Sequence, residues 1–156
     1  MRVQRHTDFL PYLLNRVVSQ LNAPMQKMLQ KRAMTLTHWR ILGILSQEDR
    51  LTISALAELS VTDQATLSRA LDRLEQRQMI RRQADTDDSR QFRVTLLARG
   101  RKEYREISAY AQQVQAWAFR EMSGPDRTRL RQMLLALDDS MTADDDIANV
   151  RVKEVI

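Results

Sequence analysis

The side chains with the clearest binding chemistry lie in one short stretch, between residues 63 and 78. Four apolar residues recur there at helical steps and so share one face of an expected helix: Leu67, Ala70, Leu71 and Leu74. On a helical wheel, Thr66, Arg69 and Arg73 point away from that face. A guanidinium binds guanine through two hydrogen bonds or a phosphate through its charge, and a hydroxyl binds either group. The outward face is therefore a candidate nucleic-acid surface.

The same residues have a plainer explanation. A solvated helix surface also contains arginines, and Arg69 and Arg73 could pair there with the neighbouring acids Asp72 and Glu75. Arg77, closer to the end of the helix, is expected to be structural. From the sequence alone, both explanations of Arg69 and Arg73 stay open.

The residues before this helix fit a helix-turn-helix arrangement. Thr52 is suited to cap a short apolar helix, and residues 60–62 form a tight turn after it. In such a pair the second helix enters the major groove and offers its early residues to base edges. We expect Arg69 to read a base and Arg73 to bind phosphate. The rest of the expected DNA-facing set comprises Ser54, Gln64, Ala65, Thr66 and Ser68.

After this helix the apolar period changes from helical to two. Phe92, Val94 and Leu96 alternate with polar residues, residues 79–83 precede them, and 85–89 supply turn chemistry. The pattern predicts a two-stranded hairpin. A basic residue near the tip of such a ribbon can enter the narrow minor groove. Arg90 is the candidate, with Asp88 orienting it, and an ordinary turn is the alternative.

Long amphipathic helices are expected on both sides of this module. The first spans residues 9–29, with Pro11 in its first turn and a kink at Pro24, and Thr37 is suited to cap the next helix. Another long helix follows residue 97, and a break at 123–125 precedes a last one. The expected fold class is mainly α with a small β-hairpin wing, a winged helix-turn-helix between long N- and C-terminal helices.

Composition removes several classes of function. The chain has 156 residues, a length typical of one domain, and only three glycines and three prolines, which argues against turn-rich β folds. It has no cysteine, so disulfides, thiol nucleophiles and thiolate metal sites are excluded. Neither His6 nor His38 lies near a serine in a sharp strand-to-helix turn, so we expect no hydrolase. We also expect no cofactor and no metal site.

Charge and hydropathy point to a polyanionic partner rather than to a membrane. The net charge is +5, and residues 62–102 carry a basic excess. The start of the chain lacks an apolar leader, and no apolar run is long enough to span a bilayer, so a cytoplasmic protein is expected. A membrane-surface helix over residues 8–32 is the weaker alternative, because its basic residues do not gather on one face.

Order and spacing together resemble the winged helix-turn-helix of the MarR family of bacterial transcription regulators. The flanking helices extend the resemblance to about residues 8–141. The matching pieces themselves lie within residues 51–100: Leu51-Thr52, Ala55 to Leu59, Thr66-Leu67-Ser68-Arg69, Leu71-Asp72-Arg73-Leu74-Glu75, Ile80-x-Arg82, Asp88-x-Arg90 and Val94-x-Leu96 through Gly100. Two positions depart from the family pattern. Gln78 replaces the glycine that usually ends the recognition helix, and Leu97 replaces a threonine cap.

The resemblance implies a homodimer on double-stranded DNA. Its divisions would be an N-terminal dimerisation helix (1–35), a winged helix-turn-helix lobe (36–100; recognition helix about 63–78, wing about 79–96), C-terminal dimerisation helices (101–141) and a tail (142–156). Two recognition helices would then meet a pseudopalindromic operator. An intramolecular helix bundle is the alternative to the dimer. A winged-helix protein that serves DNA architecture or protein contacts, without ligand control, is the alternative function.

The resemblance also implies a repressor that is released by a small, often phenolic or aromatic carboxylate ligand. Such an acid needs a cation or hydrogen-bond donor beside apolar walls. The candidate residues for this pocket are Tyr12, Arg16, His38, Trp39 and Tyr110. Ordinary core or interface packing is the alternative for each of them. The absence of cysteine excludes the thiol-oxidation switch of some relatives.

Overall fold

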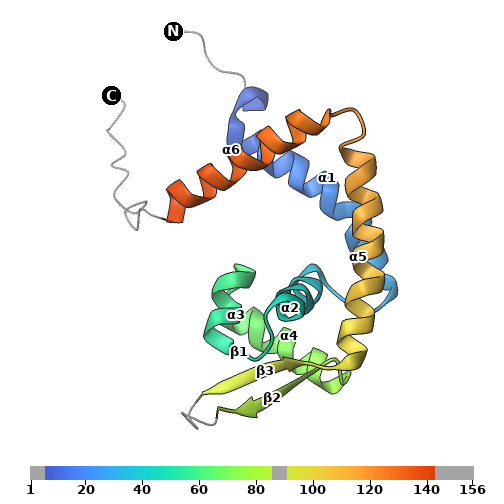
Figure 1. The fold of residues 1–156 in the computed structure, drawn as a ribbon, viewed down its shortest axis with the longest axis vertical. Coiled ribbons are helices and arrows are strands. Elements are labelled where there is room, and N and C mark those ends of the chain that lie inside the picture. Colours follow the sequence, from blue (N-terminus) through green and yellow to red (C-terminus); the bar gives the residue numbers. More distant parts are fainter. Residues whose placement is uncertain (1–5, 86–90, 143–156) are drawn as a thin grey trace. The chain divides into compact units, whose positions relative to one another are not determined.

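A computed structural model describes residues 6–85 and 91–142 (Figure 1). Two compact units divide between Gln115 and Ala116. Elements follow in the order η1 (His6–Asp8), α1 (Leu10–Lys31), α2 (Leu36–Gln47), β1 (Leu51–Thr52), α3 (Ile53–Ser60), α4 (Gln64–Gln76), β2 (Ile80–Ala84), β3 (Phe92–Leu96), α5 (Ala98–Ala118) and α6 (Gly124–Thr142). The expected winged helix-turn-helix class is confirmed. The expected tail lies almost entirely outside the described residues.

The sheet contains one strand that the sequence did not predict. Its order is β1-β3-β2, and both pairings are antiparallel. The expected hairpin is present as β2 and β3, which pair from Ile80 opposite Leu96 to Ala84 opposite Phe92. Strand β1 adds only Leu51 opposite Val94 and Thr52 opposite Arg93. Two residues are too few to show a period, so this strand depends on tertiary pairing.

The helix starts follow local capping chemistry. Pro11 lies in the first turn of α1 as expected, and the helix continues through Pro24 to Lys31. Thr35, not Thr37, caps α2, so that prediction was wrong. The Thr35 hydroxyl accepts a hydrogen bond from the His38 backbone N–H at 3.2 Å, and the Thr35 N–H donates to His38 Nδ1 at 3.1 Å. A reciprocal cap needs a side chain three residues on that can accept, and Thr35 with His38 meets that need.

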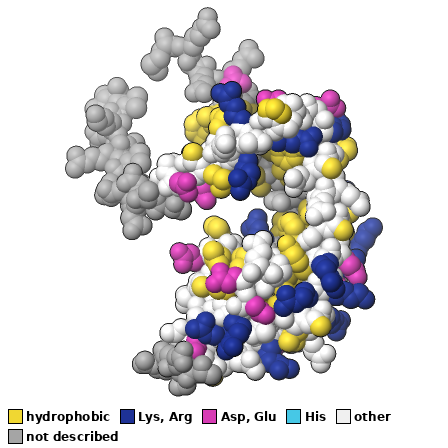
Figure 2. All heavy atoms as spheres, in the orientation of Figure 1, with side chains coloured by type: hydrophobic (Ala, Val, Ile, Leu, Met, Phe, Trp, Pro, Cys, Tyr) yellow, Lys and Arg dark blue, Asp and Glu magenta, His cyan; other side chains and the backbone are white. Residues whose placement is uncertain are grey.

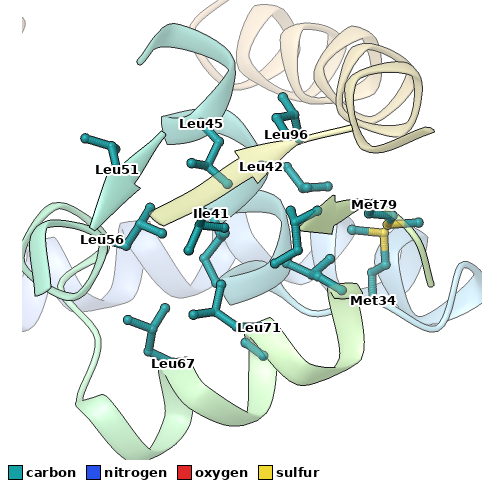
Figure 3. Packing of buried hydrophobic residues seen from close by; sticks show 14 of the residues in the cluster. Met34, Ile41, Leu42, Leu45, Leu51, Leu56, Leu67, Leu71, Met79 and Leu96 are labelled. Atoms are coloured by element: carbon teal, nitrogen blue, oxygen red, sulfur yellow. The ribbon is translucent and has the colours of Figure 1, made fainter. Parts of the chain in front are cut away.

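The hydrophobic core lies where α2, α3 and α4 meet the sheet (Figure 3). Fully buried leucines from these three helices fill its centre, and residues from α1 and α5 extend it: Leu42, Leu45, Leu56, Leu67, Leu71, Leu74, Leu29 and Ile107. The inner face predicted for residues 63–78 is therefore confirmed. Because this face is packed on the core, the opposite face of α4 points away from the core.

Three helices end without glycine at a residue in the left-handed conformation. Ala33, Val61 and Gln78 have φ of 52°, 50° and 56°. At the end of α4, Gln78 N–H donates to Glu75 O at 2.8 Å, and Met79 N–H donates to Leu74 O at 2.9 Å. This is the Schellman pattern. Helix α4 thus closes without a glycine cap, as expected, with Gln78 in the strained position.

Candidate nucleic-acid interface

The start of α4 is set by an exposed carboxylate. Asp63 precedes the helix, and its Oδ1 accepts a hydrogen bond from the Thr66 backbone N–H at 2.9 Å. The bond from the Thr66 N–H is the main reason that the pKa of Asp63 lies below its usual range, followed by the Thr66 hydroxyl. The positive charge of Arg69 acts in the same direction. The carboxylate is therefore ionised at the point where the helix begins.

The predicted DNA-facing residues of α4 lie opposite the core. Thr66 is half-buried, and the others are exposed: Gln64, Ala65, Ser68, Arg69 and Arg73. Arg69 Nη2 donates to Thr66 Oγ1 at 3.3 Å, so its guanidinium lies along the helix toward the N-terminus. Ser54 is exposed on α3. The structure thus brings the outward positions onto one helix, and their contact with DNA remains a prediction.

The acids that could have neutralised these arginines bind another residue. Arg82 Nη2, on β2, lies 2.7 Å from both Asp72 Oδ1 and Glu75 Oε2. Arg82 also donates its backbone N–H to Glu75 Oε1 at 2.7 Å and its Nε to Glu75 Oε2 at 2.8 Å. The alternative in which Asp72 and Glu75 pair with Arg69 and Arg73 is therefore contradicted. Across residues 6–85 and 91–142, neither arginine has an ion pair.

The Arg82 contacts join the wing to the recognition helix, a link that sequence reasoning missed. Burial alone would raise the pKa of Glu75. The hydrogen bonds from the Arg82 backbone and guanidinium together lower it by more than burial raises it, so the pKa of Glu75 lies below its usual range. The only sequence signal was an arginine two residues after the buried Ile80, a position that gives no partner. Arg77 donates to the Ala33 carbonyl at 3.0 Å, which confirms its structural role.

A second pair holds the base of the wing. The buried Asp85 carboxylate pairs with Arg93 of β3, and Arg93 Nη1 donates to the Arg50 carbonyl at 3.1 Å. The predicted minor-groove pair, Asp88 and Arg90, lies outside the described residues. Figure 2 shows Lys and Arg side chains, interspersed with acidic ones, on the lobe that carries the helix-turn-helix.

The five candidate ligand residues divide between two settings. Trp39 of α2 and Tyr110 of α5 are half-buried and pack against the same core. Tyr12 is half-buried on α1, and Arg16 on the same helix is exposed. His38 is buried, with its Nδ1 used in the cap of α2. Burial, with the nearby charges of Arg73 and Arg77, lowers the pKa of His38.

Two polar atoms near this region have no hydrogen-bond partner among the described residues. They are the indole Nε1 of Trp39 and the hydroxyl of Ser108, and both are buried. The helices that carry them touch, because a Cβ at Gly43 of α2 would lie 3.1 Å from the Tyr104 ring of α5. An open hollow of about 580 Å³ lies elsewhere, at the end of α4, and none of the five candidates lines it.

The described part of the chain, residues 6–85 and 91–142, has neither a candidate metal cluster nor a membrane-spanning helix. No three His, Asp or Glu side chains gather there as metal ligands would. No helix within those residues has the length and apolar character needed to cross a bilayer.

The fold and the outward basic helix define a winged-helix DNA-binding protein. The MarR family model matches residues 34–92. A MarR-family transcriptional regulator from Silicibacter pomeroyi is 32% identical, with a TM-score of 0.73 over 95% of this chain and 94% of its own. The chain therefore belongs to the MarR family of transcriptional regulators, which bind DNA. No curated protein matches it.

Two more distant structures share the fold. BpsR of Bordetella bronchiseptica, whose DNA binding is regulated by 6-hydroxynicotinic acid, is 22% identical, with a TM-score of 0.80 over 87% of this chain and 97% of its own. NadR, in complex with 4-hydroxyphenylacetate, is 23% identical, with a TM-score of 0.74 over 88% of this chain and 97% of its own. At these identities the likeness concerns the fold alone.

Proposed function

We propose that this protein is a homodimeric repressor that reads a pseudopalindromic operator in double-stranded DNA. The observation that carries the proposal is the outward face of α4. Arg69 and Arg73 are exposed there, and the acids beside them are bound by Arg82. Two exposed guanidiniums that have no ion pair among residues 6–85 and 91–142, on a helix whose other face is packed on the core, suit entry into the major groove.

The residues of this face have different roles in the proposal. Arg69 reads a base edge, and Thr66 and Ser68 contact bases or phosphates. Arg73, one turn further along the helix, binds phosphate and fixes the register. Gln64 and Ala65 at the helix start and Ser54 on α3 complete the contact. The wing pair Asp88 and Arg90 is proposed to reach the minor groove.

Apolar surface supports the homodimer. A run of large apolar side chains is exposed along the N-terminal helix: Phe9, Leu10, Leu13, Leu14, Val17 and Val18. A second run is exposed on α6: Met133, Leu134, Leu135, Leu137 and Met141. Contiguous apolar surface of this kind marks a protein interface. Light scattering should therefore give twice the chain mass of 18.2 kDa, whereas a single chain mass at micromolar concentration would support the intramolecular alternative.

The ligand proposal depends on the contact between α2 and α5. A small aromatic acid would find apolar walls there, with Trp39 Nε1 and the Ser108 hydroxyl as hydrogen-bond donors that have no partner among the described residues. Tyr110 belongs to the same helix as Ser108, and Tyr12, Arg16 and His38 complete the proposed set. Binding would release DNA only if the acid prefers the conformation that binds DNA poorly. The fluorescence of a Trp117→Phe variant, whose remaining tryptophan is Trp39, titrated with 4-hydroxyphenylacetate as a chemically representative probe, tests this step.

Arginine substitutions test the DNA-reading proposal. Arg69→Ala should cost about 1–3 kcal/mol on the preferred duplex and relax the preference at one base position. Arg73→Ala should weaken all duplexes alike and lower the salt slope by about one. Arg105→Ala, which removes an exposed arginine of α5 outside the proposed site, is the control. Equal losses on preferred and random DNA for Arg69→Ala would favour the architectural alternative.

A further inference from the structure

A chain of polar contacts runs along the exposed edge of the recognition helix. Asp63, Thr66 and Arg69 are spaced three residues apart, so they lie one above another. The Asp63 carboxylate holds the Thr66 backbone N–H at 2.9 Å, and the Thr66 hydroxyl accepts a hydrogen bond from Arg69 Nη2 at 3.3 Å. Asp63 and Arg69 are both exposed. The chain thus places one negative charge beside the arginine that is proposed to read a base.

We propose that Asp63 is a specificity-determining residue of the DNA interface. Its carboxylate positions Arg69 through Thr66 and, by repelling phosphates, disfavours binding to DNA of the wrong sequence. The inference rests on the proposed DNA-reading role of α4. It assigns to Asp63 a second task beyond capping the helix.

The choice of cap is the first argument. Serine and asparagine cap helices about as well as aspartate, and threonine caps them only slightly less well. The two other side-chain caps in this lobe use neutral hydroxyls, from Thr35 before α2 and Thr52 before α3. Only the cap at the proposed DNA-facing helix, among these three, carries a charge. Capping alone does not require that charge.

The location of the charge is the second argument. The N-terminus of a helix attracts anions, because its free N–H groups and its dipole favour negative charge. At α4 the Asp63 carboxylate already occupies that position. A phosphate that approached the same end would meet a like charge. Non-specific binding depends mainly on phosphate attraction, so a carboxylate here weakens the main interaction by which random DNA is bound.

The position of Arg69 is the third argument. A free arginine side chain samples many rotamers, and fixing one of them on binding has an entropic cost. Its contact with Thr66, together with the nearby Asp63 charge, biases the guanidinium along the helix before DNA arrives. A pre-oriented fork loses less freedom when it binds guanine. Removal of the carboxylate should therefore weaken selection at the base that Arg69 reads.

Asp63→Asn and Asp63→Ser separate this role from capping. Both variants keep a side chain that caps the helix, so their melting temperatures should stay within a few degrees of the wild type. Each should bind a random duplex about three- to fivefold more tightly at moderate salt, with a salt slope steeper by about 0.9, as for one added phosphate contact. Affinity for the duplex selected by the wild type should not rise in parallel, so the ratio of specific to random binding falls.

Two controls complete the experiment. Glu121→Gln removes one exposed carboxylate from the second unit and adds the same net charge, so it tests for a general charge effect. Asp63→Ala removes the cap as well and reports its contribution to stability. Unchanged binding ratios in Asp63→Asn and Asp63→Ser, with preserved selection by the wild type, would overturn this inference alone. A wild-type protein that selects no sequence would overturn the proposed function, and this inference with it.

Discussion

Gly100 of α5 packs so closely that the replacement of its hydrogen by a methyl group has a calculable effect. A Cβ built at this position would lie 2.3 Å from the Met79 carbonyl oxygen and 2.8 Å from Leu96 Cδ1. Real Cβ contacts essentially never fall below 3.0 Å, so the carbonyl would have to move by about 0.7 Å. That oxygen belongs to the backbone and accepts a hydrogen bond from Leu97 N–H at 2.9 Å. It cannot turn aside as a side chain would.

The energy change for Gly100→Ala follows from three contributions. Displacement of a bonded carbonyl in a packed site costs about 1–3 kcal/mol. Overpacking against Leu96 adds about 1–3 kcal/mol. The better helix propensity of alanine returns up to about 1 kcal/mol. The net loss should be about 3 kcal/mol, which for a chain of this length corresponds to a drop of roughly 6–12 °C in melting temperature.

The other two glycines provide an internal scale for this prediction. A Cβ at Gly43 would lie 3.1 Å from the Tyr104 ring, and a Cβ at Gly124 would have no atom within 4 Å. Thermal unfolding followed by circular dichroism should therefore rank the alanine variants, with Gly100 the most destabilised, Gly43 intermediate and Gly124 within about 0.5 kcal/mol of the wild type. A Gly100→Ala protein that melts with the wild type would refute the packing argument.

Two further predictions concern the cap of α2 and the turn of the helix-turn-helix. Burial holds the pKa of His38 below its ordinary 6.5. The imidazole therefore binds a proton more readily in the unfolded chain than in the folded one, and the free energy of unfolding should fall as the pH drops below about 6.5. In urea melts between pH 5 and 8, His38→Gln, which keeps a capping side chain, should flatten this dependence, and an unchanged slope would contradict the assignment. Val61 is β-branched, 89% exposed and at φ 50°. Val61→Gly should therefore raise the free energy of unfolding by about 0.5–1 kcal/mol. Val61→Ala, which keeps a Cβ in the same conformation, should gain less, and destabilisation by glycine would show that the turn is not strained.

Local periodicity was sufficient for the elements that carry the proposed site. Helical spacing gave the buried face of α4, and alternation gave β2 and β3, because both patterns reflect direct contact with one core. Strand β1 was missed because its two residues pair only after Leu51 and Val94 meet in the fold. The cap of α2 was misplaced by two residues, since histidine is not the usual partner in a reciprocal cap.

The sequence was enough to predict which way the side chains of the candidate site point, but not which residues they bind. The outward positions of Arg69 and Arg73 follow from the helical wheel. The partner of Glu75 does not, because Arg82 reaches it only when β2 folds back along α4. Likewise, His38 stood out as an imidazole near Trp39, and only the fold shows that its Nδ1 is used in the cap of α2.

We propose above all that this chain reads DNA sequence as a dimer through α4. Selection from a random duplex pool by the purified protein, at near-physiological salt and followed by sequencing, tests it most directly. A dimer that reads DNA through two α4 helices should recover a two-fold symmetric site whose half-sites lie about 10 base pairs apart. Recovery of duplexes without a shared sequence, bound in a manner that salt abolishes, would contradict it.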